Sequence, residues 1–140
     1  MTRTQLDGLR AEISALRAMH TVGRVSAVQG GALRVAGLSA LARLGDRVRI
    51  QTRSGAVLTG EVLQLEEASI LVLPEETVEG VALGDRVILL GAAAIAPSAD
   101  WIGRVIDPYG QPLDGRPLLR GSQDRAIRAT PPPAARRRAL

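Results

Sequence analysis

The stretch RVRIQTRSGAVLTGEVLQL, residues 47–65, decides the fold class of this chain. In its first half, Val48 and Ile50 alternate with charged or polar neighbours, so an extended strand here has one apolar face and one polar, solvent-exposed face. Ser54-Gly55 is a hairpin turn, and a second strand-like run follows it. The pattern predicts two antiparallel strands in the wall of a small barrel.

Short β-branched runs separated by glycine-containing turns continue on both sides of this hairpin. This pattern is typical of a small β-sandwich or β-barrel. We predict a mainly β fold, a barrel of roughly six strands, with a second hairpin turn at Gln29-Gly30-Gly31 and a bulge at Gly60. The expected strands cover residues 22–28, 32–36, 47–53, 56–65, 69–73 and 85–90.

An amphipathic helix is predicted before the barrel, over residues 5–19. Leu6, Leu9, Ile13 and Leu16 recur at spacings of three, four and three, which places them on one stripe. We predict that this stripe binds a partner, because so short a stripe at a chain terminus has little domain to pack against. A helix folded back on its own domain, or a disordered segment, is the alternative.

Two turn signals lie in the segment WIGRVIDPYGQPLDGRPL, residues 101–118. Asp107-Pro108-Tyr109-Gly110 predicts a type I turn, with the Asp side chain accepting backbone N–H bonds. Asp114-Gly115 predicts a second tight turn, since glycine adopts positive φ without steric cost. We assign the geometry of this ribbon to six residues: Gly103, Asp107, Gly110, Pro112, Asp114 and Gly115.

Charge is distributed unevenly along the chain. Residues 116–140 contain seven Arg and one acidic residue, a net of +6, whereas residues 1–115 contain eleven Arg and thirteen acidic residues, a net of −2. A folded nucleic-acid-binding module carries its positive stripe on the domain face, usually beside aromatic residues. We therefore expect no nucleic-acid partner. A small barrel that binds nucleic acid through its Pro-rich, Arg-rich tail is the alternative from another functional class.

The residue types that several kinds of active site need are absent from the sequence. There is no Cys for thiolate chemistry, and His20 is the only His, which rules out a multi-histidine metal site within one chain. No Lys is present, so no phosphate-binding GxxxxGK[ST] loop can exist. We expect no catalytic, nucleotide-binding or metal-binding residue in this chain, and no enzymatic activity from it alone.

Three further features have structural interpretations. Leu44-Gly45-Asp46-Arg47-Val48 is echoed by Leu83-Gly84-Asp85-Arg86-Val87, and each places a Gly-Asp turn before a strand. His20 is expected to be an exposed junction residue. Five glutamates are expected to be solvated loop charges rather than a metal site: Glu66, Glu67, Glu75, Glu76 and Glu79.

Several of these motifs together resemble the N-terminal barrel of the flagellar and type III protein-export ATPases, members of the rotary ATP synthase catalytic-subunit superfamily. The resemblance covers roughly residues 21–118, and it continues more loosely into the tail. It rests on the Leu-Gly-Asp-Arg-Val echoes, Val22-Gly23-Arg24-Val25, Ala36-Gly37-Leu38, Val78-Glu79-Gly80-Val81, Ile102-Gly103-Arg104-Val105 and Pro112-Leu113-Asp114-Gly115.

The resemblance implies what the chain does in a larger protein. In the family, ATP and Mg are bound by a catalytic domain beyond such a barrel, the full-length protein is a homo-hexamer, and hydrolysis drives protein export. The chain looks like an N-terminal fragment, with the N-terminal helix docking a regulatory or stator protein. A fragment of an ATP synthase subunit is the alternative within the superfamily.

The resemblance also sets expectations for organisation and location. We expect a helix over residues 1–20, a β-barrel oligomerisation domain over residues 21–97, and a linker ribbon leading into the start of an α/β nucleotide-binding domain over residues 98–140. No run reaches the roughly 18 apolar residues of a membrane span, and the first 19 residues lack the apolar block of a signal peptide. The expected location is cytoplasmic, peripheral to the inner-membrane export apparatus.

Overall fold

The computed structural model describes Leu6, Arg10, Ile13, residues 19–131 and residues 133–136. The chain divides into two compact units, Arg17–Ala92 and a second unit formed by Met1–Leu16 with Ala93–Leu140. Each unit is described below by itself.

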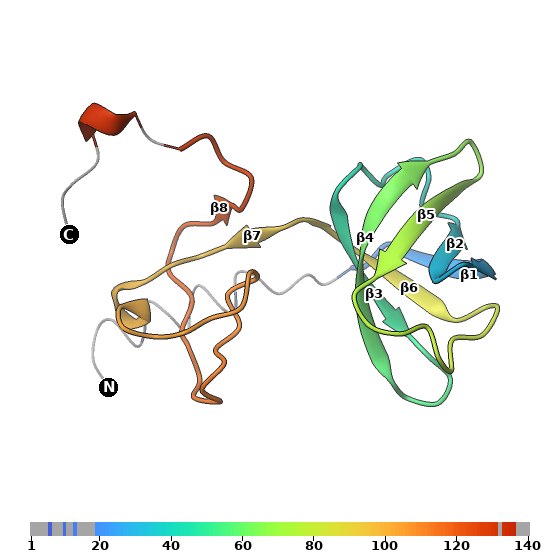
Figure 1. Ribbon diagram of the computed structural model, residues 1–140, viewed down its shortest axis with the longest axis horizontal. Helices are drawn as coiled ribbons and strands as arrows, with labels where there is room; N and C mark the ends of the chain where they lie inside the picture. The colour runs from blue at the N-terminus through green and yellow to red at the C-terminus, as the bar shows by residue number, and fades with distance from the viewer. Residues whose placement is uncertain (1–5, 7–9, 11–12, 14–18, 132, 137–140) are drawn as a thin grey trace. The chain divides into compact units, whose positions relative to one another are not determined.

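The first unit is a closed β-barrel of six antiparallel strands (Figure 1). Around the barrel the order is β1-β2-β5-β4-β3-β6, so each strand pairs with two neighbours and none has a free edge. The strands are β1 (Val22–Gln29), β2 (Ala32–Ala36), β3 (Asp46–Gln51), β4 (Val57–Leu65), β5 (Ser69–Pro74) and β6 (Arg86–Ala92). The predicted fold class is confirmed, and the predicted strands match these within a few residues.

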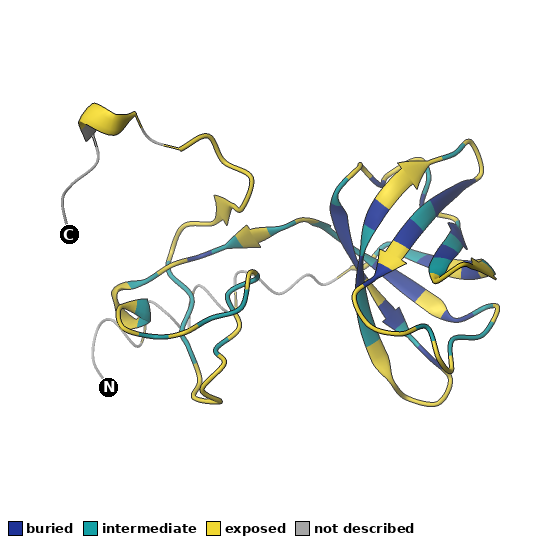
Figure 2. Ribbon diagram, viewed as in Figure 1, coloured by how far each residue is buried: buried dark blue, intermediate teal, exposed yellow. Residues whose placement is uncertain are grey.

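The barrel core is built of aliphatic side chains, as a chain without Phe requires. Buried residues recur along the barrel strands (Figure 2). Val48 and Ile50 of β3 are completely buried, which confirms the alternation expected for this strand. The remaining core is drawn from the other strands and the loops between them: Val25, Leu33, Val35, Leu38, Ala42, Val62, Ile70, Val72 and Val87. Removing this apolar surface from water, at about 25 cal/mol per Å², is the main stabilising term of the unit.

Two hairpins have the predicted turns. Gln29 pairs with Ala32, and the intervening Gly30 and Gly31 have φ of 56° and 84°, as a two-residue hairpin requires. At the second hairpin, Thr52 N–H donates to the Ala56 carbonyl over 3.0 Å. The pairing register of the β1–β2 and β3–β4 hairpins is therefore set by their turns.

The bulge predicted at Gly60 is wrong. Gly60 pairs regularly with Val48 of β3 and Pro74 of β5, and the irregularity of β4 lies between Val62 and Gln64. A Cβ atom on Gly60 would come within 2.7 Å of the Leu73 carbonyl oxygen. Glycine is required here because the backbone of β5 approaches closely.

The second unit has little regular structure. Its strands β7 (Ala94–Ile95) and β8 (Arg125–Ala126) form a two-residue antiparallel ladder, and 3-10 turns occur at Ala99–Trp101 and Ala134–Arg136. The linker and tail expected on either side of the ribbon are thus partly paired with each other. Within the described residues, no helix is long and apolar enough to cross a membrane.

Candidate functional site

The first turn of the ribbon is organised by the Asp107 side chain. Its Oδ1 atom accepts hydrogen bonds from the backbone N–H groups of Tyr109 and Gln111, each over 2.8 Å. Gly110 N–H donates to the Asp107 carbonyl over 3.1 Å, which closes the turn. The predicted role of Asp107 as an acceptor of backbone N–H groups is confirmed.

A short hairpin is built on this turn. Asp107 N–H donates to the Gln111 carbonyl over 2.8 Å, and Leu113 N–H donates to the Val105 carbonyl over 3.0 Å. Between these bonds, Ile106 and Pro112 form an isolated antiparallel bridge. Both hydrogen bonds of the bridge are made by the flanking residues, so the missing N–H of Pro112 removes neither of them.

The second turn is held by an ion pair. Arg104 Nε and a terminal nitrogen donate to the two carboxylate oxygens of Asp114 over 2.7 and 2.6 Å. The same guanidinium donates to the Arg116 carbonyl over 2.9 Å, and Arg116 N–H donates back to Asp114 over 3.1 Å. Gly115, between them, has φ of +70°, as predicted.

These contacts favour the charged forms of both partners in the ion pair. The hydrogen bonds from Arg104, and then the backbone N–H of Arg116, lower the pKa of Asp114 to about 2. The same pairing raises the pKa of the Arg104 guanidinium above its ordinary value. Both partners are therefore charged at neutral pH, and the turn is closed by a bidentate ionic contact.

A cavity of about 390 Å³ lies against the ribbon within the same unit. Trp101 and Tyr109, the only two aromatic residues of the chain, line it together with Gly110 and Arg120. Trp101 is fixed by its indole N–H, which donates to the Leu119 carbonyl over 2.9 Å. A Cβ atom on Gly110 would come within 2.8 Å of the Trp101 ring, so glycine is needed both for the turn and for this contact.

The six residues assigned to the ribbon from sequence therefore form its turns and bridge, with Gly103 also at positive φ (+78°). Sequence reasoning missed Arg104, which closes the second turn. The ten-residue separation of Arg104 and Asp114 gives no local signal, because the two meet only after the first hairpin forms. The role of the ribbon as an interdomain joint stays a prediction.

The predicted partner stripe is described only in part. Leu6 and Ile13 are helical, and their side chains are 44% and 61% exposed. Leu9 and Leu16 lie outside the described residues. The exposed fractions leave these two apolar side chains available for contact, and their partner role stays a prediction.

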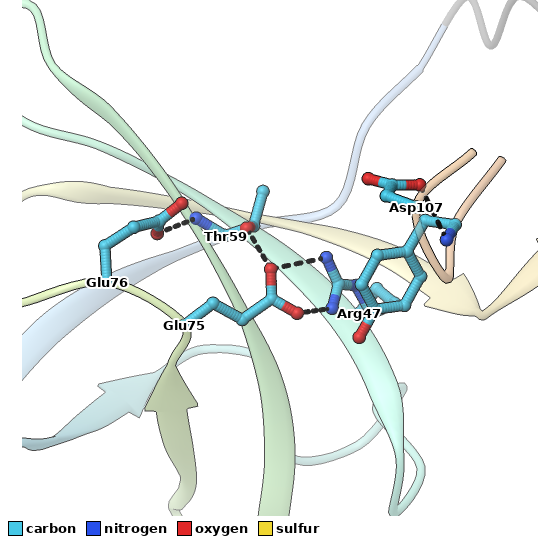
Figure 3. A network of polar contacts seen from close by, with 6 residues as sticks. Arg47, Thr59, Glu75, Glu76 and Asp107 are labelled. Carbon is cyan, nitrogen blue, oxygen red and sulfur yellow. Dashed lines mark hydrogen bonds and ion pairs between the residues drawn. The ribbon is translucent and has the colours of Figure 1, made fainter. Parts of the chain in front are cut away.

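Glutamates that were expected to be solvated loop charges instead make polar contacts within the barrel (Figure 3). Glu75 pairs with Arg47 of β3 and accepts a hydrogen bond from the Thr59 hydroxyl of β4. Glu76 accepts from Thr59 N–H over 3.2 Å. Glu66 likewise binds Arg34 and Ser69, so three of the five glutamates fasten strands or turns rather than being free loop charges.

The two copies of the Leu-Gly-Asp-Arg-Val echo share one local structure. Asp46 and Asp85 each accept the N–H of the residue three positions earlier over 2.9 Å, and the preceding glycines have φ of +80° and +85°. Both Asp side chains are buried at the start of a strand. The interpretation of the echo as a chain-reversing turn is consistent with this geometry.

The described residues include no cluster of candidate metal ligands. They contain no group of three or more His, Cys, Asp or Glu side chains placed to hold a metal ion. The sequence contains no Lys for a phosphate loop.

Comparison with known proteins gives a consistent set of relatives. The chain is 38% identical over 117 residues to the flagellum-specific ATP synthase of Rhizobium meliloti, covering 83% of this chain and 25% of that protein. It is 34% identical over 131 residues to the flagellum-specific ATP synthase of Caulobacter vibrioides, covering 92% of this chain and 30% of that protein. No protein-family model matches the sequence.

Other ATP synthase subunits are also among the relatives. The ATP synthase subunit alpha of an Arthrobacter species is 29% identical over 120 residues, covering 85% of this chain and 21% of that protein. The chain therefore spans only about a quarter of the length of the curated relatives that it matches.

Proposed function

Because the chain is a homologue of the N-terminal portion of the flagellum-specific ATP synthases, we propose that it is the oligomerisation and regulator-docking part of such an ATPase. In this proposal the whole protein couples ATP hydrolysis to protein export. ATP and Mg are held by other parts of that protein. The chain fixes the relative positions of neighbouring subunits, so that residues from both converge on one nucleotide.

The observation that carries the proposal is an apolar strip on the outside of the closed barrel. Leu63 of β4 and Leu73 of β5 are 49% and 48% exposed. The two strands are paired neighbours, and Leu73 lies opposite Glu61, two positions before Leu63. Leu65 lies opposite the completely buried Ile70, so it shares the inner face of the sheet and is not part of the strip. Exposed apolar side chains that gather on one face are typical of protein–protein contacts.

The barrel architecture favours a contact through side chains. All six strands are paired on both sides, so a neighbouring subunit cannot add a strand to a free edge. A neighbour would instead pack against the strip, and a ring would follow if successive contacts closed. We propose six copies in the full-length protein, by analogy with the family.

The N-terminal helix is proposed as the docking element for a regulatory or stator protein of the export apparatus. Its support is the stripe of Leu6, Leu9, Ile13 and Leu16, of which Leu6 and Ile13 are exposed. This docking would keep the ATPase in the cytoplasm at the membrane-bound export machinery.

Sedimentation velocity on the full chain, over a wide range of concentration, tests the oligomerisation proposal. We expect reversible self-association, weakened at least about tenfold by the double variant Leu63→Glu/Leu73→Glu, since interface centres contribute more than 1 kcal/mol per residue. Leu41→Glu is the matched control, because Leu41 is 62% exposed and lies in the loop between β2 and β3 rather than in β4 or β5. A monomer at every concentration would contradict the proposal, and thermal unfolding checks that each variant is folded.

A further inference from the structure

Charge is segregated between the strands of the barrel. Residues 57–79, which contain β4 and β5, have six Glu and no Arg, Lys or Asp, a net of −6. The rest of the barrel, residues 21–56 and 80–92, has seven Arg and two Asp, a net of +5. Both of these Asp side chains, Asp46 and Asp85, are buried. Every exposed acidic side chain of the barrel therefore belongs to β4, β5 or their flanking loops.

The basic side includes a pair of like charges where β1 meets β6. Arg24 lies directly opposite Arg86, both side chains are exposed, and like charges in this arrangement repel each other. Arg24 donates to the Gly84 carbonyl over 3.0 Å, and among the described residues neither guanidinium pairs with a carboxylate. Asp85 does not neutralise them, because it is buried and its Oδ1 atom makes no hydrogen bond in the described part of the chain. Arg53 lines the same cavity as this pair, so the surface is strongly basic.

The acidic side carries the strip formed by Leu63 and Leu73. Glu76 and Glu79 follow in the loop directly after β5, and both are exposed. Glu76 accepts the Thr59 N–H over 3.2 Å, and within the described residues neither glutamate pairs with an arginine. An apolar strip with an acidic end thus faces away from the barrel.

The strand order places these two surfaces on opposite sides of the barrel. Counted around the closed sheet, β1 is three strands from β4, and β6 is three strands from β5, the largest separation that six strands allow. A contact between the two surfaces is therefore heterologous, since each copy keeps one unused surface of each kind. Such contacts continue from copy to copy and form a ring where the rotation closes.

Both charge clusters also lie at the same end of the barrel. Gln51 of β3 pairs with Arg86 at the start of β6 and with Val57 at the start of β4. Gly60, near the start of β4, pairs with Pro74 at the end of β5, directly before the acidic loop. Two barrels that lie side by side with the same end up therefore bring the arginines of one level with the glutamates of the other.

We propose that the β1–β6 surface of one copy of this chain binds the β4–β5 surface of the next copy, with Arg24 and Arg86 facing Glu76 and Glu79. This inference rests on the oligomerisation proposed above, and it adds the second surface and the head-to-tail order. The strip supplies apolar contact, whereas the charges fix the orientation. They also oppose strip-to-strip pairing, which would bring two acidic surfaces together.

Sedimentation velocity of charge-reversed forms of the full chain tests this inference. Arg24→Glu/Arg86→Glu makes the basic surface acidic, and Glu76→Arg/Glu79→Arg makes the acidic loop basic. Each variant alone should self-associate at least about tenfold more weakly than the wild type, since like charges across an interface repel each other. An equimolar mixture of the two variants should regain the association, because every contact then joins opposite charges.

Arg43→Glu/Arg125→Glu is the control with the same change in net charge as the arginine variant. Both residues are exposed, Arg43 lies in the loop between β2 and β3, and Arg125 lies in β8 of the second unit. We expect this control to associate as the wild type does, since neither residue belongs to the two surfaces.

The outcomes separate this inference from the proposed oligomerisation. Wild-type self-association of Arg24→Glu/Arg86→Glu would overturn the head-to-tail contact and leave oligomerisation through the strip standing. A mixture that does not regain association would also overturn it. A wild-type chain that is monomeric at every concentration would contradict both. Unfolding midpoints are measured in parallel, and the single variants Arg86→Glu and Glu79→Arg give the same comparison if a double variant does not fold.

Discussion

Arg104 holds both carboxylate oxygens of Asp114, at 2.7 and 2.6 Å, across ten residues of sequence. The same guanidinium reaches the Arg116 carbonyl, so one side chain ties the strand before the first turn to both sides of the second turn. Arg104 therefore closes the second turn, while Asp107 organises the first turn.

Arg104→Gln should raise the pKa of Asp114 from about 2 toward the ordinary value near 3.9. An NMR titration of the Asp114 carboxyl carbon measures this. Arg116→Gln is the control and should change the pKa much less, because the backbone N–H of residue 116 remains. An unchanged Asp114 pKa in Arg104→Gln would show that the ion pair does not form in solution.

The same pair sets a pH dependence. The pKa of Asp114 is lower in the folded state than in the unfolded state, so its contribution to stability is complete above about pH 4. It is lost as the pH falls toward 2. Protease resistance of the ribbon should therefore decrease over this window in the wild-type chain, and Arg104→Gln should already show the reduced resistance at neutral pH.

Gly115→Val should loosen the ribbon while the barrel survives. Gly115 has φ of +70°, and no atom lies within 4 Å of the position that a Cβ atom would take, so the penalty is conformational and about 1–3 kcal/mol. Gly115→Asn is the matched control, because Asn tolerates positive φ better than a β-branched residue. Limited proteolysis between Ala96 and Leu118 is the measurement, and a Val variant as resistant as the wild type would remove this turn from the account.

Leu9→Asp/Ile13→Asp should abolish capture of the regulatory partner and leave the melting temperature of the barrel within a few degrees. Ile13 is 61% exposed, and surface substitutions change stability by only about 0.5 kcal/mol. Ala11→Asp/Ala15→Asp is the control, since a helical repeat of 3.6 residues puts these positions opposite the stripe. Loss of the folded barrel in the first variant would show that the stripe belongs to a core.

The parts of the fold that the sequence predicts are those with short-range signals. Strand alternation at Val48 and Ile50, and the glycine pair at residues 30 and 31, depend on neighbours in the chain, and the structure agrees with both. The role of Gly60 has no such local signal, because the close approach of the Leu73 carbonyl depends on β5, which follows later in the chain.

Contacts between distant residues escape sequence reasoning for the same reason. Ala94 pairs with Ala126, and Arg47 pairs with Glu75. No repeating pattern in the sequence indicates that these distant residues meet. A two-residue ladder is also too short to show alternation. The orphaned Oδ1 of Asp85 has no sequence signal at all, since the same five-residue motif around Asp46 leaves no such atom.

The central claim is that this chain serves an ATPase by its structure and does no nucleotide chemistry itself. Calorimetric titration of the full chain with ATP and Mg tests it most directly, with the flagellum-specific ATP synthase of Rhizobium meliloti as the positive control. We predict no binding heat from the chain, because it has no Lys and no phosphate-binding loop. A stoichiometric heat with a micromolar Kd would contradict the account.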